Sequence, residues 1–544
     1  MKYLLFCFSI ILFFSCKQNN ADLIVKNATI YTVNNQFEIA QVIVIKDGIF
    51  IAVGGDTLLN KYHSANTIDA NKQFIYPGFI DAHCHFTGYA MDKYKLALFG
   101  TKSFNEIIEK LNQYAQTNKR EWIEGRGWDQ NDWTEKSFPT KDTLDKLFPN
   151  TPVFLMRIDG HAVLCNQTAL DKANINLNTK INGGEIEIKN GKLTGILIDN
   201  AVDIVKNILP QRTEKEIIED FIIAQQDCVS LGLTTVVDCG IKKNTVAYLQ
   251  HAYKENKLQI KNTVLLSDEK ENYDTYLHQT PYKDKNFHIA GFKVYADGAL
   301  GSRGAYMIQP YNDKHNYAGL LLKPLDSIQQ IATKVFQSKY QLCTHAIGDA
   351  ANRDILKIYA NTLKTKNDRR WRIEHAQVID PLDFHYFGQY SIIPSVQPTH
   401  ATSDMYWAED RIGKERMKNA YAYKKLLNQN NWLPLGTDFP VEYINPIYTF
   451  YAAVFRFDKN EFPAQGFEPE NALSRQEALK GITIWAAKSV FEEQEKGSIE
   501  VGKMADFVIL PIDIMKADAK TIYQTTIYAT YINGTNIYQN KTQK

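Results

Sequence analysis

Several features that would place this chain in a broad functional class are scarce or missing. Its 544 residues carry 62 Lys and Arg against 61 Asp and Glu, so a net charge of +1 provides no basic surface for nucleic acid or for an anionic membrane. No internal repeat or low-complexity segment is visible. Chemistry on a small molecule remains the favoured function, in a chain long enough for a large barrel and a second domain.

Cysteine is also scarce, with seven in the whole chain. Two lie near the N-terminus, and the other five are odd in number and widely scattered: Cys84, Cys165, Cys228, Cys239 and Cys343. This spacing shows no disulfide framework. Cys84 and Cys343 lie beside histidine segments but on the opposite strand parity, and are expected to be packed, inert thiols.

The apolar run at the N-terminus is too short to cross a membrane and remain there. Leu4 to Phe14 follows a charged Lys2, as in a secretory signal. Residues 1–16 resemble a bacterial lipoprotein signal peptide, with Cys16 as the lipidated first residue of the mature protein. The resemblance implies a cell-envelope protein held on a membrane outside the cytoplasm through its N-terminal lipid only. A secreted or periplasmic protein is the alternative.

Short apolar runs near both ends of the chain predict one β domain made from two separate parts. In residues 17–76, runs such as Gln41 to Ile45 are separated by glycine-containing turns. Residues 491–544 contain similar runs, among them Tyr531 to Tyr538. We expect the two parts to form one small composite β-sandwich.

Between these parts, residues 77–490 alternate strand-like and helical patterns, as βαβ units around a parallel sheet do. Eight candidate strands can be counted: Phe74 to Ala82, Thr234 to Cys239, Ile260 to Ser267, Ala290 to Ala296, Tyr340 to Thr344, Trp371 to Glu374, Ser391 to Val396 and Trp432 to Thr437. Eight strands close a TIM-like (β/α)8 barrel, so the predicted fold class is α/β. Residues 86–215 are too many for one crossover and predict an inserted subdomain.

The most informative motif lies at the end of the first candidate strand, where His83 and His85 are separated by one residue. Successive side chains of a strand point to opposite faces, so these two histidines would project together and could share one metal ion. An isolated pair could equally be a chance feature of a loop. Barrel enzymes place their chemistry at the carboxyl ends of the strands. Metal-compatible side chains lie in or after four other candidate strands: Lys293, His345, His375 and Asp438.

Imidazole and carboxylate groups suit a hydrolytic zinc, as a single ion or as two ions that share an activated water. Lys293 is unusual, because a lysine within an apolar strand is costly to bury in its charged form. It is either neutralised or paired with an acid such as Asp297. Asp81 shares strand parity with His83, and either orients that ligand or makes an ordinary structural pair.

Four longer segments accompany these side chains: Gly298 to Ala305, Ser395 to His400, Asp438 to Val441 and Lys496 to Asp506. Together with the histidine motif, they make the chain similar to the amidohydrolase superfamily, in the amidohydrolase-3 group of YtcJ-like proteins and N-substituted formamide deformylases. The resemblance covers nearly the whole mature chain. It is specific for the group and not for a substrate.

The resemblance implies a metal-dependent hydrolase that cleaves a non-peptide carbon–nitrogen bond in a small amide-like substrate, with one or two divalent ions, most simply Zn²⁺. The implied ligands are His83 and His85 for the more buried ion, His345 and His375 for the second, Lys293 as the bridge, and Asp438 as both ligand and general base. In a binuclear site, the Lys293 amine would be carboxylated by CO2. The alternatives are a mononuclear deaminase or other hydrolase with unmodified Lys293, and a binding lipoprotein without catalysis, for which a damaged ligand position is expected and none is seen.

Three further side chains are candidates for substrate contact: His400 after the seventh candidate strand, Arg303 and Trp128. A guanidinium offers a planar fork to a carboxylate, and an indole offers a stacking face. Loops also use Arg and Trp simply to hold themselves in place. His161, within the insertion, is a candidate for a lid over the barrel mouth.

Overall fold

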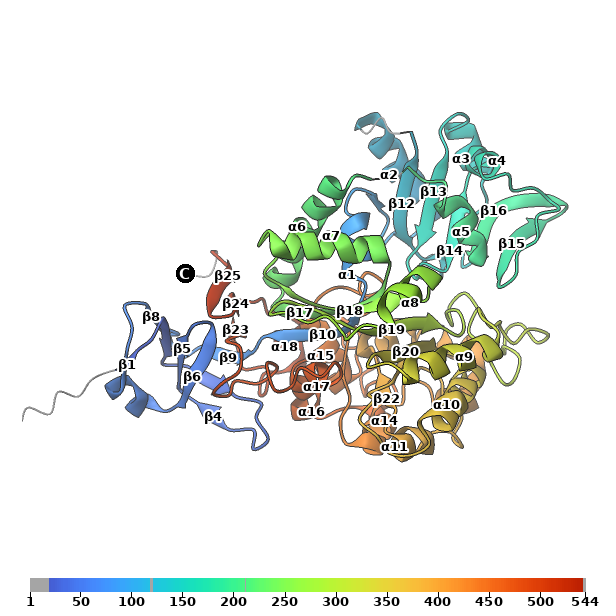
Figure 1. Cartoon of the computed structure of the whole chain (residues 1–544). Helices are drawn as coiled ribbons and strands as arrows, with labels where there is room; N and C mark the ends of the chain where they lie inside the picture. The colour runs from blue at the N-terminus through green and yellow to red at the C-terminus, as the bar shows by residue number, and fades with distance from the viewer. Residues whose placement is uncertain (1–18, 118–120, 211, 542–544) are drawn as a thin grey trace, which may run out of the picture.

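A sheet of seven parallel strands forms the centre of the computed structural model, which describes residues 19–117, 121–210 and 212–541. The strands follow one another across the sheet in chain order, with helices packed around them (Figure 1). They are β10 (Phe79–Cys84), β17 (Leu233–Ile241), β18 (Lys261–Ser267), β19 (Phe287–Tyr295), β20 (Gln341–Ala346), β21 (Arg372–His375) and β22 (Ile393–Ser395). The prediction of a mixed α/β, barrel-like centre is confirmed.

The eighth predicted strand, Trp432 to Thr437, is not a regular strand in the structure. Its backbone still lies between the two edges of the sheet. The N–H of Gly436 donates to the carbonyl of Val396 at 3.0 Å, and the carbonyl of Leu435 accepts from the N–H of Ala82 at 3.2 Å. The proline before Leu435 has no N–H to donate, so a continuous ladder cannot form.

The first predicted strand is divided in two. β9 (Phe74–Pro77) pairs within a different sheet, and β10 begins two residues later. Gly78 lies between them, and a Cβ atom there would meet the side chain of Thr234 at 2.4 Å. The chain therefore passes from one sheet to the other at a point where only glycine fits.

The two ends of the chain form two further sheets, and in one of them blue strands from the N-terminal part and red strands from the C-terminal part lie side by side (Figure 1). One has the order β6-β5-β2-β8 and the other β25-β24-β23-β9-β3-β4. Their remaining bounds are β2 (Leu23–Lys26), β3 (Thr29–Tyr31), β4 (Ile39–Ala40), β5 (Val42–Lys46), β6 (Ile49–Gly54), β8 (Thr67–Asp69), β23 (Phe507–Leu510), β24 (Ala529–Ile532) and β25 (Thr535–Gln539). Val25, Phe50 and Phe507 share one hydrophobic core, so the two chain ends are packed together.

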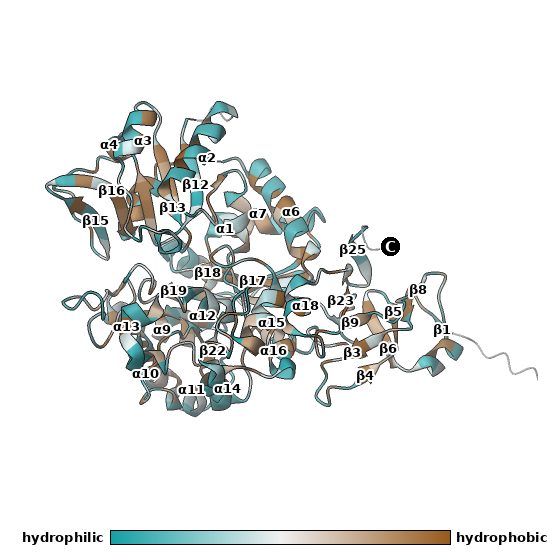
Figure 2. Ribbon diagram, turned by 180° about the vertical axis from the view of Figure 1, so that it is seen from behind, coloured by the Kyte–Doolittle hydropathy of each residue, from teal (hydrophilic) through white to brown (hydrophobic). Residues whose placement is uncertain are grey.

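Between β10 and β17 the chain forms a separate six-stranded sheet of order β11-β12-β13-β14-β16-β15. Its strands are β11 (Leu96–Ala97), β12 (Ile123–Trp128), β13 (Val153–Arg157), β14 (Ala162–Cys165), β15 (Gly184–Lys189) and β16 (Lys192–Asp199), and its helices are α2 (Phe104–Thr117), α3 (Asp142–Leu147), α4 (Gln167–Lys172) and α5 (Asn200–Lys206). Apolar residues concentrate on its central strands (Figure 2), which bury a core of their own. This segment is called the insertion below.

The helices outside the insertion connect and cover the strands of the central sheet. They are α1 (Phe86–Asp92), α6 (Glu214–Ser230), α7 (Lys243–Lys254), α8 (Lys270–Tyr276), α9 (Leu325–Phe336), α10 (Asp349–Leu363), α11 (His385–Tyr390), α12 (Pro398–Asp404), α13 (Ala408–Met417), α14 (Tyr423–Asn430), α15 (Pro446–Phe455), α16 (Arg475–Gly481), α17 (Ile484–Lys488) and α18 (Ala519–Gln524). Among the described residues, no helix has both the length and the apolar character needed to span a bilayer. Cys16 and the rest of the predicted signal peptide lie outside the described residues.

Candidate metal centre

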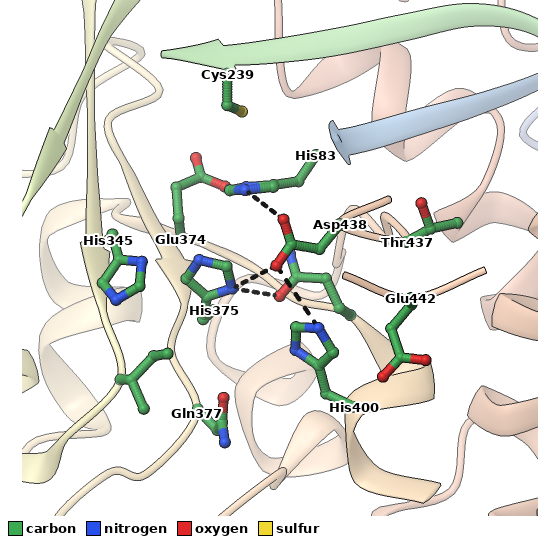
Figure 3. A network of polar contacts seen from close by, with 12 residues as sticks. His83, Cys239, His345, Glu374, His375, Gln377, His400, Thr437, Asp438 and Glu442 are labelled. Carbon is green, nitrogen blue, oxygen red and sulfur yellow. Dashed lines mark hydrogen bonds and ion pairs between the residues drawn. The ribbon is translucent and has the colours of Figure 1, made fainter. Parts of the chain in front are cut away.

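The predicted ligands converge at the carboxyl ends of the central strands (Figure 3). One ligand atom from each of His83, His375 and Asp438 lies within 4.8 Å of the others, and all three residues are buried. Nε2 of His85 lies 3.1 Å from Oδ1 of Asp438, and Nε2 of His83 lies 3.5 Å from the same oxygen. Strand ends that are far apart in the sequence therefore form one compact group of nitrogen and oxygen donors.

Three of these histidines are held through Nδ1 by an oxygen acceptor. Nδ1 of His83 contacts the carboxylate of Glu374, that of His85 lies 3.1 Å from the carbonyl of Cys239, and that of His375 lies 2.8 Å from Oε1 of Gln397. A proton on Nδ1 satisfies each contact and leaves Nε2 unprotonated. Histidine ligands of metals are commonly oriented in this way.

The protonation states suit a cation. Burial, followed by the charge of Lys293, lowers the pKa of His83 to about 4, and burial holds the pKa of His375 well below its usual range. Burial alone would raise the pKa of Asp438, but His85, His83 and His375 hold it well below its ordinary value. Oδ1 of Asp438 is also buried without a well-aligned hydrogen-bond donor. Neutral imidazoles around an ionised, incompletely satisfied carboxylate form a donor set that fits a divalent metal.

His345 differs from the other three histidines. Its ring centroid lies 4.5 Å from that of His375, but its Nε2 faces the carbonyl of Gly298 and Oδ1 of Asp297, both at 3.5 Å. Burial holds its pKa well below the usual value. The structure therefore brings His345 beside the group with its Nε2 directed towards oxygen atoms of the loop after β19.

Lys293 is fully buried, and its Nζ lies 3.3 Å from Nε2 of His83. Within the part of the chain that the structure describes, no carboxylate oxygen lies within 4.0 Å of this amine. Asp297, the acid considered above as its partner, instead accepts backbone N–H groups of Ile347 and Gly348. Burial opposes the charged amine, but nearby acidic groups, first Tyr295 and Cys239, raise the pKa of Lys293 overall.

Asp81 holds the backbone and does not contact the His83 ring. Its carboxylate accepts from the hydroxyl of Thr437 at 2.6 Å and from the backbone N–H groups of Thr437 and His83 at 3.0 and 3.1 Å. Burial raises the pKa of Asp81 to about 7 against these hydrogen bonds. Of the two roles considered above, the structure shows the structural one, in which Asp81 fastens the irregular eighth segment to β10.

The sequence patterns did not identify Glu374 as a partner of the site. Glu374 is fully buried between His83 and Arg372, whose Nε lies 2.6 Å from Oε1. Burial would raise the pKa of Glu374, but Arg372 and His83 hold it well below its usual range. Strict strand alternation directs Glu374 and His375 to opposite faces. The alternation ends at His375, where φ is +73°, so both side chains reach the site.

Gln397 was also missed as a partner of His375, although it lies within one of the segments that suggested the family. His400, from the same segment, is 8% exposed, and its Nε2 lies 3.6 Å from Oδ2 of Asp438. Burial lowers the pKa of His400. Of the three predicted substrate contacts, His400 is the one that lines the cavity described below.

A cavity of about 660 Å³ lies over this group, between the strand ends and the insertion. The barrel side contributes Lys293, His345 and Asp438, and the insertion contributes Arg157 and His161. Burial would lower the pKa of His161, but the hydrogen bond and charge of Asp199 raise it to about 9. The insertion thus places an imidazole that is paired with a buried carboxylate in the wall of the cavity.

Trp128 and Arg303 lie elsewhere. Trp128 is fully buried in the core of the insertion, and its indole N–H donates to the carbonyl of Leu155 at 2.8 Å. Both sides of the Arg303 fork bind Asp313, at 3.0 and 2.8 Å. Neither residue lines the cavity, so the structure places both where they stabilise loops and packing.

Comparison with known proteins assigns the chain to a family. A family model described as "Amidohydrolase family" matches residues 66–538. The chain is 31% identical to Protein LONG AFTER FAR-RED 3 of Arabidopsis thaliana, over 95% of this chain and 92% of that protein. It is 30% identical to the putative amidohydrolase YtcJ of Bacillus subtilis (94% and 98% covered) and 24% identical to the N-substituted formamide deformylase of Arthrobacter pascens (95% and 98% covered).

A solved structure shows the same similarity. An uncharacterized metal-dependent hydrolase from Pyrococcus horikoshii OT3 superposes with a TM-score of 0.76 at 26% identity, over 91% of this chain and 99% of that one. Both kinds of comparison extend across the barrel and the terminal sheets.

Proposed function

The chain belongs to the amidohydrolase family and is a metal-dependent hydrolase, and we propose that it cleaves the carbon–nitrogen bond of an amide or N-substituted formamide. One observation carries the proposal: His83, His85 and His375, each with Nδ1 held by an oxygen, lie around the ionised Asp438, and Nε2 of His83 and of His85 approaches its Oδ1. The similarity to a protein named N-substituted formamide deformylase supports the choice of bond.

A divalent metal bound here supplies Lewis acidity and a water that ionises near neutral pH. His83, His85, His375 and Asp438 would hold it, with His345 beside them for a second ion. Asp438 accepts a proton from the attacking water and later delivers it to the departing nitrogen. The new C–O bond replaces the C–N bond, so water and amide give a carboxylate and an amine.

We also propose that Lys293 carries CO2 as a carbamate when two ions are bound. Tyr295 and Cys239 would have to be ionised to favour the Lys293 ammonium strongly, yet burial raises the pKa of both. An amine beside the Nε2 of His83, with no carboxylate within 4.0 Å among the described residues, is better placed as a neutral nucleophile for CO2.

Two measurements test these proposals. The first is formate release from N-benzylformamide by the zinc-loaded protein lacking residues 1–16, with Asp438→Asn as the inactive control. No turnover of a panel of formamides and simple amides would refute the choice of bond. The second is metal content per chain. About two ions in the wild type and fewer in Lys293→Ala support the carbamate bridge, whereas one ion in both favours a mononuclear hydrolase or deaminase.

The finer architecture and the location are proposals as well. We propose that the seven strands and the irregular segment at 432–437 occupy the eight positions of a (β/α)8 barrel, and that the two terminal sheets form a β-sandwich. We further propose that Cys16 anchors the protein by a lipid to a membrane outside the cytoplasm. Loss of fatty-acid labelling and of membrane fractionation in Cys16→Ala would support the anchor, and unchanged labelling would refute it.

A further inference from the structure

His161 and Asp199 form a pair that the hydrolytic mechanism above leaves unused. Nδ1 of His161 lies 2.7 Å from Oδ1 of Asp199, and the two residues are also joined by a backbone hydrogen bond of 2.7 Å. They lie beside the paired strands β14 and β16 of the insertion. The sheet of the insertion therefore fixes the ring relative to the carboxylate.

The barrel makes room for this pair. The loop after β19 has glycine at positions 298 and 304, and a Cβ atom at either position would lie 3.2 Å from an oxygen of Asp199. The side chain of Asp199 is 1% exposed, and its Oδ2 is buried without a hydrogen bond. Burying a carboxylate with one oxygen unsatisfied is costly, so its retention beside a single imidazole indicates a function for the ring.

The free nitrogen of His161 faces the cavity. Asp199 occupies Nδ1, and Nε2 makes no hydrogen bond to any residue that the structure describes. The ring lies 5.8 Å from that of His345, which lies 4.5 Å from that of His375, whose Nδ1 in turn lies 3.9 Å from Oδ2 of Asp438. Successive neighbours thus connect His161 with Asp438 through the two histidines.

The two arginines of the cavity wall are already engaged. The guanidinium of Arg157 contacts Asp129, Asp159 and Gln130. Arg126 binds Asp92 at 3.0 Å. An acyl carbon attacked by water develops negative charge on its oxygen, and a preorganised donor at that position is a large source of catalysis.

We propose that Nε2 of His161 donates a hydrogen bond to the substrate's carbonyl oxygen and stabilises the tetrahedral oxyanion, while the carboxylate of Asp199 binds Nδ1 and fixes the orientation of the ring. This rests on the proposed hydrolytic function. No proton leaves His161 in the reaction. Proton transfer from the attacking water and proton delivery to the leaving nitrogen remain with Asp438.

The test uses methylphosphonate, a tetrahedral anion, as a probe whose binding needs no turnover. Calorimetry on the zinc-loaded protein should show that His161→Asn binds it about 10- to 100-fold more weakly than the wild type, the usual effect of losing a charged hydrogen bond. Asp199→Asn should give an intermediate loss. His63→Asn, an exposed histidine of β7 (Tyr62–His63), is the matched control and should bind as the wild type does.

Equal metal content and equal unfolding temperature in all four proteins would exclude a folding effect. Where a hydrolysed amide is found, His161→Asn should lower kcat and leave KM within about twofold. Unchanged affinity of His161→Asn for methylphosphonate, or no binding by the wild type, would overturn the inference. Absence of amide hydrolysis would overturn only the proposed function. The phosphonate comparison needs no turnover and would still decide the role of His161.

Discussion

The two ends of the central barrel treat buried charge in opposite ways. At the carboxyl ends, Asp438 and Lys293 lie among imidazoles, and no Lys, Arg, Asp or Glu side chain among the described residues forms an ion pair with either of them. At the amino ends, Lys261 at the start of β18 lies 2.5 and 2.6 Å from the two oxygens of Asp506. Ionisable groups without such a partner are available for binding and catalysis, whereas paired charges hold the fold together.

The terminal sheets meet the barrel at the amino ends of the strands, which are called the lower end below. The carboxyl ends are called the upper end. Asp506, just before β23, accepts the N–H of Asn533 as well as the amine of Lys261. Glu492 is buried between Lys496 at 2.8 Å and His288 at 3.3 Å. These contacts fasten the last part of the chain to the strand starts. Variants at the two ends should therefore fail in different ways.

The largest effect is expected at the upper end. Asp438→Asn removes the general base and should lower kcat/KM by about 10³-fold, while the temperature of unfolding without metal should stay unchanged or rise. Activity assays and calorimetry on the same preparation measure both. An apoprotein destabilised as strongly as a lower-end variant would contradict the distinction between the two ends.

The next effect is at the lower end. Asp506→Asn leaves Lys261 buried without its charge partner and should cost about 3–5 kcal/mol of unfolding free energy, with kcat/KM per folded molecule nearly unchanged. Chemical denaturation measures the cost. The double variant Lys261→Met with Asp506→Leu should recover most of it, because no charge is then left buried. Failure to recover would mean that the backbone contact to Asn533 dominates.

Glu492 gives a smaller, pH-dependent effect. Burial would raise its pKa, but Lys496 and His288 hold it well below the ordinary value, so the folded protein keeps this group ionised. The unfolded chain takes up a proton near pH 4.5, the ordinary pKa of a glutamate, so the contribution of Glu492 is present above that pH and is lost below it, by about 1.4 kcal/mol per pH unit. Glu492→Gln should therefore lose less stability than the wild type between pH 5 and 3.5. Glu415→Gln, at an exposed ion pair, is the control and should follow the wild type.

Much of this architecture was predictable from the sequence. Seven of the eight predicted strands overlap observed strands, the first of them with two, because apolar runs between helical patterns are a strong signal. The division at Gly78 and the irregular eighth segment were not predictable, since both depend on contacts between distant parts of the chain. The prediction of an amidohydrolase-family enzyme is confirmed by the family match.

The surroundings of the site were harder to predict than its histidines. His83, His85 and His375 can be predicted from their residue type and their position at strand ends. Glu374 was missed because strand alternation assigns it to the opposite face from His375, and the positive φ that cancels the alternation is not visible in a sequence. The placing of His161 beside His345 depends on how the insertion folds back over the barrel.

The smallest effect is expected for Arg303, which tests whether an ion-paired side chain near the upper end has only a structural role. It lies in the loop after β19, close in sequence to the upper end, yet its fork is fully used by Asp313 and its side chain is 31% exposed. If an ion-paired charge has a structural role at either end of the barrel, Arg303→Ala should leave KM and kcat within about twofold. It should lower the unfolding free energy by about 1 kcal/mol or less. His400→Ala, from the cavity wall, should change KM or kcat by more with similar stability. A tenfold rise in KM for Arg303→Ala would show that a paired guanidinium can still be released to bind substrate. Ion pairing would then not distinguish structural charges from charges that act in binding.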